Sequence, residues 1–237
     1  MNRRELVTTT LGGVAALTAL GALPHDAEAK PRTFTPLAPG THPVVPLGFD
    51  ASKLTGLSEK LLTSHHDNNY AKAVENLNKV ELELDKITSA TPGFQVAALR
   101  ERELNFANST LLHERYFENL GGDGKVTGAF AKALATQFGT AARWEELIRA
   151  TAMSLGGGSG WVTVAASQLT GDLRIVGSAG HTQALAHGEP ILVLDMFEHA
   201  YAIDYGAAHA KYIDAFMANL RWGVLDKRWA RALKHLP

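Results

Sequence analysis

The chain has 237 residues, of which 46% are hydrophobic and 20% charged, and its 23 basic side chains nearly balance its 24 acidic ones. This composition is typical of one or two globular domains, and the near-neutral balance argues against an ordinary nucleic-acid-binding protein. The chain has no cysteine, which excludes disulfides, thiolate zinc sites, iron–sulfur clusters and cysteine nucleophiles. A bound metal would therefore need histidine, aspartate or glutamate ligands, and the sequence has ten histidines.

Residues 1–29 are typical of an export signal. Arg3 and Arg4 precede a weakly apolar run, and "AEA" at 27–29 offers small residues for cleavage. The arginine pair resembles a twin-arginine signal, and an ordinary secretory signal is the alternative. The apolar run is short and contains glycines, so we expect no stable membrane association. The sequence thus predicts an exported protein, periplasmic or extracellular.

A helical hairpin is predicted in the first half of the mature chain. Residues 30–48 are rich in proline and threonine and predict an extended arm. Ser58 is a candidate N-cap for a helix that continues to about Ile87. The segment "TSATPGF" ends it, and a second long helix is expected over about 95–120.

The second half alternates between helical and β patterns. The glycine-rich "GGGSG" at 156–160 precedes "WVTVAAS" and "LRIVGS", which the hairpin signal "QLTGD" joins, and "ILVL" at 191–194 predicts a third, buried strand. A nucleotide-binding loop would follow a strand and open a helix, whereas "GGGSG" does the reverse, so we interpret it as a turn with close backbone packing. The remaining helices are expected at about 127–138, 140–154, 210–222 and 225–235.

This order of elements predicts an α+β fold, with an N-terminal long α-helical hairpin followed by a C-terminal mixed α/β domain that contains a three-stranded antiparallel sheet. We expect four regions: an export signal (1–29), an extended arm (30–48), a helical hairpin domain (49–122) and a C-terminal α+β domain (123–237).

Asp195 and His199 are the strongest local pair of candidate metal ligands. They follow the apolar run "ILVL" in "DMFEHAY", and a turn after the strand would let the two side chains converge. The alternative is an aspartate that caps a helix and a partly buried histidine.

Three histidines of the hairpin are further candidates. His65 and His66 are adjacent and point about 100° apart, so at most one can face a shared interior site. His113 lies among apolar residues of the second helix, where a lone histidine is more often a core residue than a ligand. One histidine from each helix, with Asp195 and His199, would make a three-histidine, one-carboxylate site that suits iron or manganese.

These segments together resemble the iron/manganese superoxide dismutase family. "DMFEHAYAIDY" resembles the family's Asp-x-Trp-Glu-His-Ala-Tyr signature, "GGGSGW" its Gly-Ser-Gly-Trp segment, and residues 49–78 align with its first helix. The resemblance covers about 46–222. It implies superoxide disproportionation to dioxygen and hydrogen peroxide, one Fe or Mn ion per subunit, and a homodimer or tetramer.

The resemblance also assigns roles to individual residues. The metal ligands it implies are His65, His113, Asp195 and His199. Trp161 matches a tryptophan in the wall of the metal pocket. Glu198 matches the residue that crosses a dimer interface to bond the ligand His199 of the other subunit, which would orient that imidazole.

Several residues depart from the family's pattern around the substrate entrance. Ala73 stands where the family has a gating tyrosine, and Asn69 where it has a histidine. Ala202 replaces the tyrosine that meets this histidine across the dimer. His209 stands where an entrance arginine is common, and Phe197 replaces the signature tryptophan.

The residue that hydrogen-bonds metal-bound solvent is altered as well. Ser109 cannot supply the glutamine of iron-type enzymes, and His181 stands where manganese-type enzymes place theirs. The resemblance therefore implies that His181 bonds the solvent and tunes the metal potential; a loop histidine without that contact is the alternative.

Two other functions remain open at this point. The entrance changes also suit an exported Fe/Mn-binding protein of the same fold with weak or no dismutase activity. The small residues Ala73 and Ala202 suit a metal-dependent oxidoreductase that acts on a larger substrate.

Overall fold

The computed structural model describes residues 36–155 and 157–237. The predicted export signal, residues 1–29, lies outside the described residues, as does the first part of the arm. Residues Leu37–Pro237 form one compact unit, and the proposed boundary between residues 122 and 123 stays a prediction. None of the described helices is long and apolar enough to cross a bilayer.

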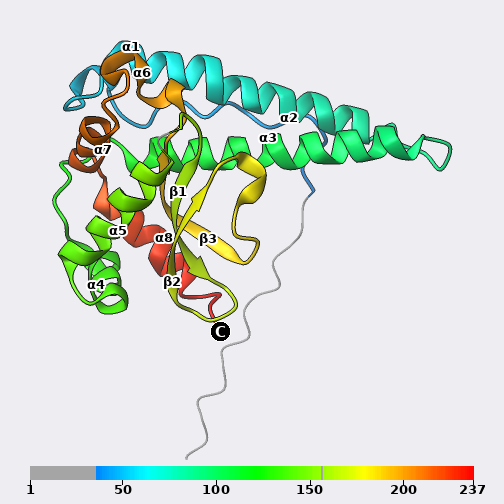
Figure 1. Cartoon of the computed structure of the whole chain (residues 1–237). Helices are drawn as coiled ribbons and strands as arrows, with labels where there is room; N and C mark the ends of the chain where they lie inside the picture. The colour runs from blue at the N-terminus through cyan, green and yellow to red at the C-terminus, as the bar shows by residue number, and fades with distance from the viewer. Residues whose placement is uncertain (1–35, 156) are drawn as a thin grey trace, which may run out of the picture. The chain divides into compact units, whose positions relative to one another are not determined.

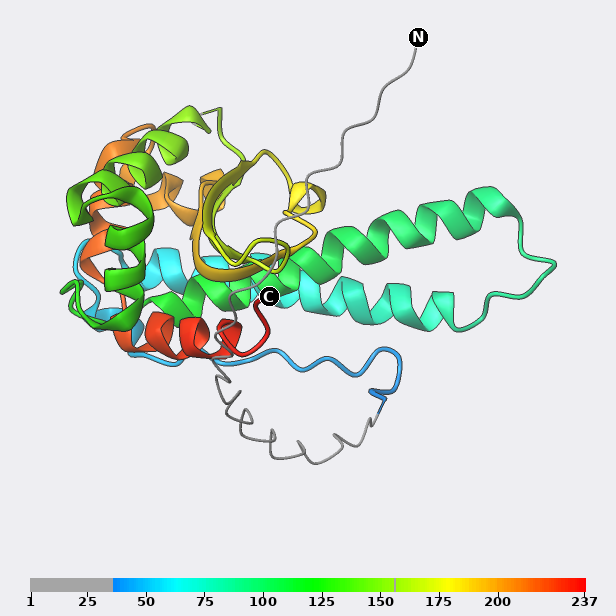
Figure 2. The same cartoon turned by 90° about the horizontal axis from the view of Figure 1, so that it is seen from below.

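The helical hairpin is formed by α1 (Glu59–Ser64), α2 (Ala71–Leu84) and α3 (Gly93–Asn119). Ser58 caps α1, as predicted, because its hydroxyl accepts the Leu61 N–H. Figures 1 and 2 show α2 and α3 side by side. The segment 36–50 contains no helix or strand.

The first helix is not one uninterrupted α-helix, and that prediction was wrong. A π-helical turn, His65–Tyr70, separates α1 from α2, and α2 ends at Leu84 rather than near Ile87. Hydrophobic spacing cannot reveal this turn, because its buried residues keep nearly the spacing of an α-helix. Turns of this kind are frequent at functional sites.

The three-stranded antiparallel sheet confirms the predicted fold class. Its strands are β1 (Trp161–Ser167), β2 (Leu173–Ser178) and β3 (Gly188–Asp195). Their order is β2-β1-β3, with β1 antiparallel to both neighbours. The buried run of β3 is longer than the predicted four residues, and Trp161 of β1 pairs with Asp195 at its end.

Two of the remaining helices, α5 and α8, pack against this sheet, and α4 and α7 pack against α5 (Figure 1). Helices α4 and α5 lie within one residue of the predicted bounds, whereas α7 ends at Ala218 and α8 already begins at Trp222. Their bounds are Gly128–Phe138 (α4), Ala141–Ser154 (α5), Ala202–Tyr205 (α6), His209–Ala218 (α7) and Trp222–Ala232 (α8). The sequence did not predict the short helix α6.

Gly160 shows why the glycine-rich segment is a tight turn. Its φ is +140°, and a Cβ there would lie 2.6 Å from the Ser178 carbonyl oxygen, so only glycine fits. Its own carbonyl accepts the Met196 N–H at 2.8 Å. The turn therefore holds the chain directly after Asp195.

Candidate metal centre

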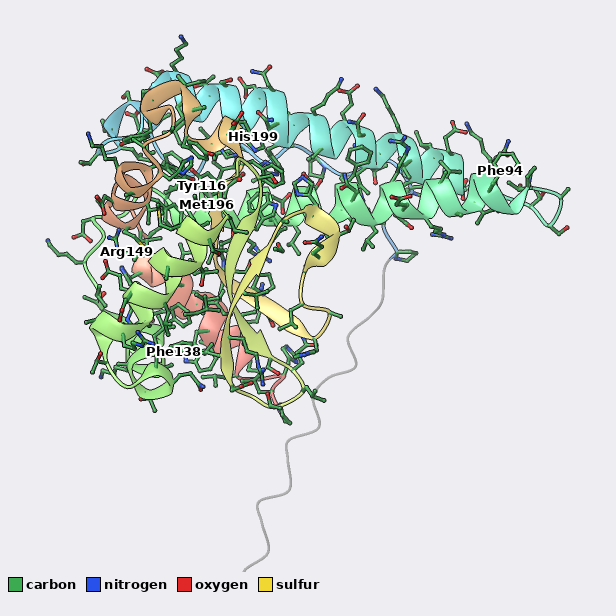
Figure 3. The ribbon with its side chains drawn as sticks, viewed as in Figure 1. Phe94, Tyr116, Phe138, Arg149, Met196 and His199 are labelled. Atoms are coloured by element: carbon green, nitrogen blue, oxygen red, sulfur yellow. The ribbon has the colours of Figure 1, made fainter. Side chains whose placement is uncertain are left out.

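His65, His113, Asp195 and His199 come together, as the sequence predicted. One ligand atom from each lies within 4.8 Å of the others, and this is the only such group found among residues 36–155 and 157–237. His65 begins the π-helical turn, His113 lies in α3, Asp195 ends β3 and His199 lies in a 3-10 helix, Glu198–Ala200. Figure 3 shows His199 at the end of the sheet nearest α2.

The three imidazoles converge on one carboxylate oxygen. Asp195 Oδ2 lies 3.1 Å from His65 Nε2, 3.6 Å from His113 Nε2 and 3.2 Å from His199 Nε2. Ligands bonded to one ion at about 2.1 Å, with angles of roughly 90–120°, stand about 3.0–3.6 Å apart. The four side chains therefore have the spacing of a shared metal site.

Unpartnered buried nitrogens support this interpretation. The Nε2 atoms of His65 and His113 have no hydrogen-bond partner among the described residues, and the two residues are only 1% and 2% exposed. His65 Nε2 is close to Asp195 Oδ2, but not in a geometry that makes a hydrogen bond. Buried polar atoms normally find a partner, so these lone pairs fit a metal ion.

Neighbouring groups set the protonation of the ligands. His113 Nδ1 lies 2.7 Å from the Ser109 carbonyl oxygen; a carbonyl only accepts, so Nδ1 carries the proton and Nε2 a lone pair. Burial lowers the pKa of His113 to about 3, and it also lowers the pKa of His65, so both rings are neutral at pH 7.

Asp195 is held ionised and oriented. Burial alone would raise its pKa, but His199 and His65 hold the pKa of this carboxyl well below its usual range. Its Oδ1 accepts the Phe197 N–H at 2.8 Å, which leaves Oδ2 facing the histidines. Tyr212 donates its hydroxyl to the Asp195 carbonyl at 2.7 Å. The carboxylate thus supplies a fixed negative charge.

His66 is excluded from the site, although it is buried. Its Nε2 lies 2.9 Å from the Val45 carbonyl oxygen and its Nδ1 lies 2.7 Å from Asp67 Oδ1. Each ring nitrogen thus lies against a protein oxygen outside the four-residue cluster, so neither ring nitrogen is left for a metal. In the structure, therefore, His65 faces the site and His66 does not.

Trp161 and His181 form a wall beside the histidines. The Trp161 ring lies edge-on to His113, with centroids 5.0 Å apart, and Trp161 Nε1 donates to His181 Nδ1 at 2.9 Å. The Phe197 ring stacks between His181 and His199, with centroids 4.9 and 5.4 Å away. Burial lowers the pKa of His181, so His181 is neutral and its single proton is on Nε2.

A pocket of about 220 Å³ leads to His113, His181 and His199. Ala73 and Asn69 line it, as expected of entrance residues, and Ser109 lies at its base near His113. Ala202 and His209 do not line it; the His209 ring instead packs edge-on against Tyr201 at 4.8 Å. None of the described residues that line this pocket is a tyrosine.

Comparisons with known proteins place this site in a family. A family model described as "Iron/manganese superoxide dismutases, C-terminal domain" matches residues 126–228. The chain is 45% identical over 190 residues to "Superoxide dismutase [Fe]" of Cupriavidus metallidurans, which covers 80% of this chain and 96% of that protein. The chain belongs to the iron/manganese superoxide dismutase family.

More distant members of the family include both metal types. "Superoxide dismutase [Mn] 2" of Haloferax volcanii is 32% identical over 195 residues, covering 80% of this chain and 95% of that protein. "Superoxide dismutase [Fe]" of Aquifex pyrophilus is 27% identical over 205 residues, covering 82% and 95%.

Sequence reasoning missed two groups that support the ligands of this superoxide dismutase family member. The first is the Ser109 carbonyl, which the four-residue spacing to His113 on one helix could have suggested. The second is Tyr212, which also bonds the Tyr116 hydroxyl at 3.2 Å. Tyr212 is 17 residues from Asp195, and no spacing rule links the two.

Proposed function

We propose that the protein is a superoxide dismutase that converts two superoxide anions and two protons into dioxygen and hydrogen peroxide. The observation that carries this proposal is the convergence of three imidazole nitrogens on Asp195 Oδ2, with two of the nitrogens buried and unpartnered. The ligands are His65, His113, Asp195 and His199. The 45% identity to an iron enzyme supports the same activity.

The ligand set suits one iron or manganese ion per subunit. When bound, the ion supplies the one-electron oxidation and reduction that the two halves of the reaction require. Asp195 contributes one negative charge, and an imidazole that binds a metal through its lone pair contributes none. The site therefore keeps a net positive charge with either metal, which favours the approach of a small anion.

His181 is the residue that we propose to handle a proton near the metal. Because Nδ1 accepts from Trp161, the proton on Nε2 is available to a solvent molecule or to a reduced oxygen species in the pocket. Trp161 thus acts by fixing the tautomer of His181. Phe197 keeps the His181 ring in place by stacking on it.

The entrance pocket admits a small anion without a gating tyrosine. Asn68, Asn69 and Asn76 place neutral carboxamides on its lining, and Lys72 adds one ammonium group. Lys72 also pairs with Glu75 at 2.6 Å. We expect activity that does not depend on a tyrosine hydroxyl, since Ala73 stands where the family has its gating tyrosine.

The second candidate function is metal binding with weak or no dismutase activity, and the absence of tyrosine from the pocket lining favours it. A larger substrate also remains a candidate, because the pocket of about 220 Å³ exceeds the volume of one water molecule, about 30 Å³. Both would leave the ligands intact.

Superoxide disproportionation per bound metal separates these functions. The protein is purified, its iron and manganese are measured, and activity is compared with the same concentration of free metal ion. We expect activity far above the free ion and a loss of about 10-fold or more in His181→Ala at unchanged metal content. Metal-loaded protein no more active than free ion would refute the dismutase proposal. Unchanged activity per bound metal in His181→Ala would refute the role of His181.

We also propose a homodimer or tetramer of an exported protein. Glu198 is exposed in the single chain, beside His199, whose side chain is 25% exposed; both are free to contact a second copy. The arginine pair at 3–4 supports export, which cell fractionation of the source organism tests.

A further inference from the structure

A second pocket, of about 330 Å³, lies between α3 and α8. Its volume is within the range of small-molecule sites, roughly 300–1,000 Å³. It is unusual in its charge, because five cationic side chains and a single carboxylate line it. The charged lining residues are Arg115, Glu118, Arg221, Lys227, Arg228 and Arg231.

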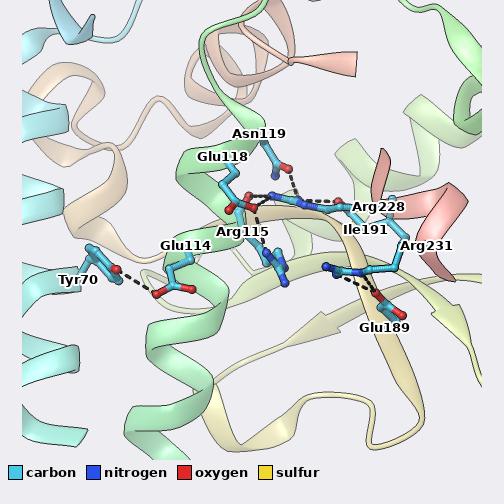
Figure 4. Close-up of polar contacts among 9 residues, drawn as sticks. All are labelled: Tyr70, Glu114, Arg115, Glu118, Asn119, Glu189, Ile191, Arg228 and Arg231. Carbon is cyan, nitrogen blue, oxygen red and sulfur yellow. Dashed lines mark hydrogen bonds and ion pairs between the residues drawn. The ribbon is translucent and has the colours of Figure 1, made fainter. Parts of the chain in front are cut away.

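Arg228 is a buried, fixed cation in the lining of this pocket, and Figure 4 shows its polar contacts. It is 4% exposed, and its Nη1 donates to Asn119 Oδ1 and to the Ile191 carbonyl, both at 2.7 Å. Its Nη2 donates to Glu118 Oε2 at 2.5 Å. The Nε atoms of Arg228 and Arg115 are buried, and neither has a hydrogen-bond partner in the part of the chain that the structure describes.

The carboxylates of the described residues do not balance these cations. Glu118 is shared between Arg228 and Arg115, and Glu189, just outside the lining, binds Arg231 at 2.9 Å.

Arg221 and Lys227 form no ion pair with a described carboxylate, and the one side-chain hydrogen bond of Arg221 goes to the Gly48 carbonyl. Arg221 is also the N-cap of α8, whose first turn has no acidic residue and no side-chain cap, so the positive end of the helix adds to the charge.

The neighbouring pocket extends this site with an apolar surface. It measures about 200 Å³, shares Glu118 and Arg221 with the cationic pocket, and is also lined by Val45, Tyr70, Phe117 and a second carboxylate, Glu114. Tyr70 donates its hydroxyl to Glu114 Oε1 at 3.0 Å (Figure 4). An aromatic group could therefore lie next to an anion bound by Arg221.

We propose that the cationic pocket binds a small oligophosphate, either inorganic pyrophosphate or the phosphate chain of a nucleotide. Arginine forks match phosphate oxygens in pairs of hydrogen bonds, and lysine adds a point charge. A multiply charged anion balances Arg221, Lys227 and Arg115 together, which a monoanion such as superoxide cannot do. The site does not depend on the metal, because Arg115 is two residues from His113 and points about 200° around α3 from it.

Isothermal titration calorimetry of full-length, metal-loaded protein with pyrophosphate tests the proposal, at about 0.1 M salt so that general charge attraction is screened. We expect one site per chain and at least about 10-fold weaker binding in Lys227→Gln and in Arg221→Gln, each of which removes one charge-assisted contact. Lys132→Gln on α4 is the matched control and should bind as wild type does. Dismutase activity should be equal in Lys227→Gln and wild type.

Pyrophosphate can also remove iron or manganese, so the metal content is measured after each titration. Removal of metal would not depend on Lys227, whereas binding in the pocket would. A nucleoside triphosphate is titrated in parallel: tighter binding than pyrophosphate identifies a nucleotide as the ligand, and equal binding identifies the inorganic anion. Absence of saturable binding, equal weakening by Lys227→Gln and Lys132→Gln, or binding of single-stranded DNA alone would overturn the proposal.

Discussion

His65 and His66 are neighbours in the chain with different environments. His65 presents an unpartnered Nε2 to Asp195, whereas His66 uses both ring nitrogens on the Val45 carbonyl and Asp67. The difference arises because adjacent residues of a helix point in different directions around its axis. Two identical side chains therefore serve different purposes, one in the metal site and one in holding the arm.

We predict that His65→Ala abolishes metal binding and that His66→Ala does not. His65 is one of the four proposed ligands, so its loss should weaken metal binding by more than the roughly 10–100-fold expected for a residue behind the ligands. The measurement is metal content per chain after purification in excess iron or manganese, with circular dichroism to verify folding. Equal loss of metal in the two variants would contradict the assignment.

The bond from Trp161 to His181 is another property of individual residues. An indole N–H can only donate, so His181 must accept at Nδ1, and this contact fixes its tautomer. Sequence resemblance suggested that both residues belong to the pocket. The direction of the bond required their positions, because Trp161 begins β1 whereas His181 lies in a short 3-10 helix after β2, 20 residues further along the chain.

Helices α3 and α8 are joined by the buried Arg228. Its guanidinium reaches the Ile191 carbonyl of β3 and the Asn119 side chain of α3. Burial lowers the pKa of Arg228 to about 10, so it remains charged at pH 7. Glu118, which is about half exposed, supplies the compensating charge at 2.5 Å.

We predict that Glu118→Gln reduces the free energy of unfolding at pH 7 by about 1 kcal/mol, a small value because solvent screens the exposed half of the carboxylate. Burial raises the pKa of Glu118, but Arg228 and Arg115 lower it by more than burial raises it, so the pKa lies below its usual value. A carboxyl whose pKa is lower in the folded than in the unfolded protein stabilises the fold at pH values above its unfolded-state pKa, about 4.3. That stabilisation disappears as the pH falls through the folded-state pKa.

Urea unfolding of wild type and Glu118→Gln at pH 7, 5 and 3.5 measures the difference in their free energies of unfolding. It should be constant between pH 7 and 5 and should shrink at pH 3.5. Glu146→Gln, which breaks an exposed pair with Arg143, is the control and should have little effect at any pH. A difference that grows on acidification would contradict the assigned role of Glu118.

We expect the metal site to be completed by a second subunit. His199 directs Nε2 toward Asp195, which leaves Nδ1 for another partner. Glu198 is exposed, and its backbone N–H bonds the Gly158 carbonyl at 3.3 Å. The loop that carries both residues is therefore anchored while the Glu198 carboxylate remains accessible.

We predict that Glu198→Ala weakens the dimer and lowers metal affinity together, because each His199 would lose the carboxylate that orients it. The expected loss of metal affinity is about 10–100-fold. Sedimentation velocity measures the dimer and competition with a chelator measures the metal. Glu101→Ala, an exposed position on α3, is the control, and a fully dimeric, metal-replete Glu198→Ala would refute the bridge.

Local patterns predicted some elements better than others. The bounds of β1 and β2 match because β-branched residues and the turn "QLTGD" act within a few residues. The end of α7 was missed because Asn219 bonds both the N–H and the carbonyl of Thr55, at 3.0 and 2.7 Å. These partners are 164 residues apart, so helical periodicity contains no sign of the break.

Composition and local pattern established that a metal site would use histidine and carboxylate, and that a helical hairpin precedes a three-stranded sheet. Resemblance selected the four ligands. Only the tertiary structure decided which nitrogen of each ring faces Asp195, and only it brought the cations of α8 beside those of α3. Hydrogen bonds and charge interactions depend on separations of a few ångströms between residues that lie up to 173 positions apart, and neither spacing nor propensity records such separations.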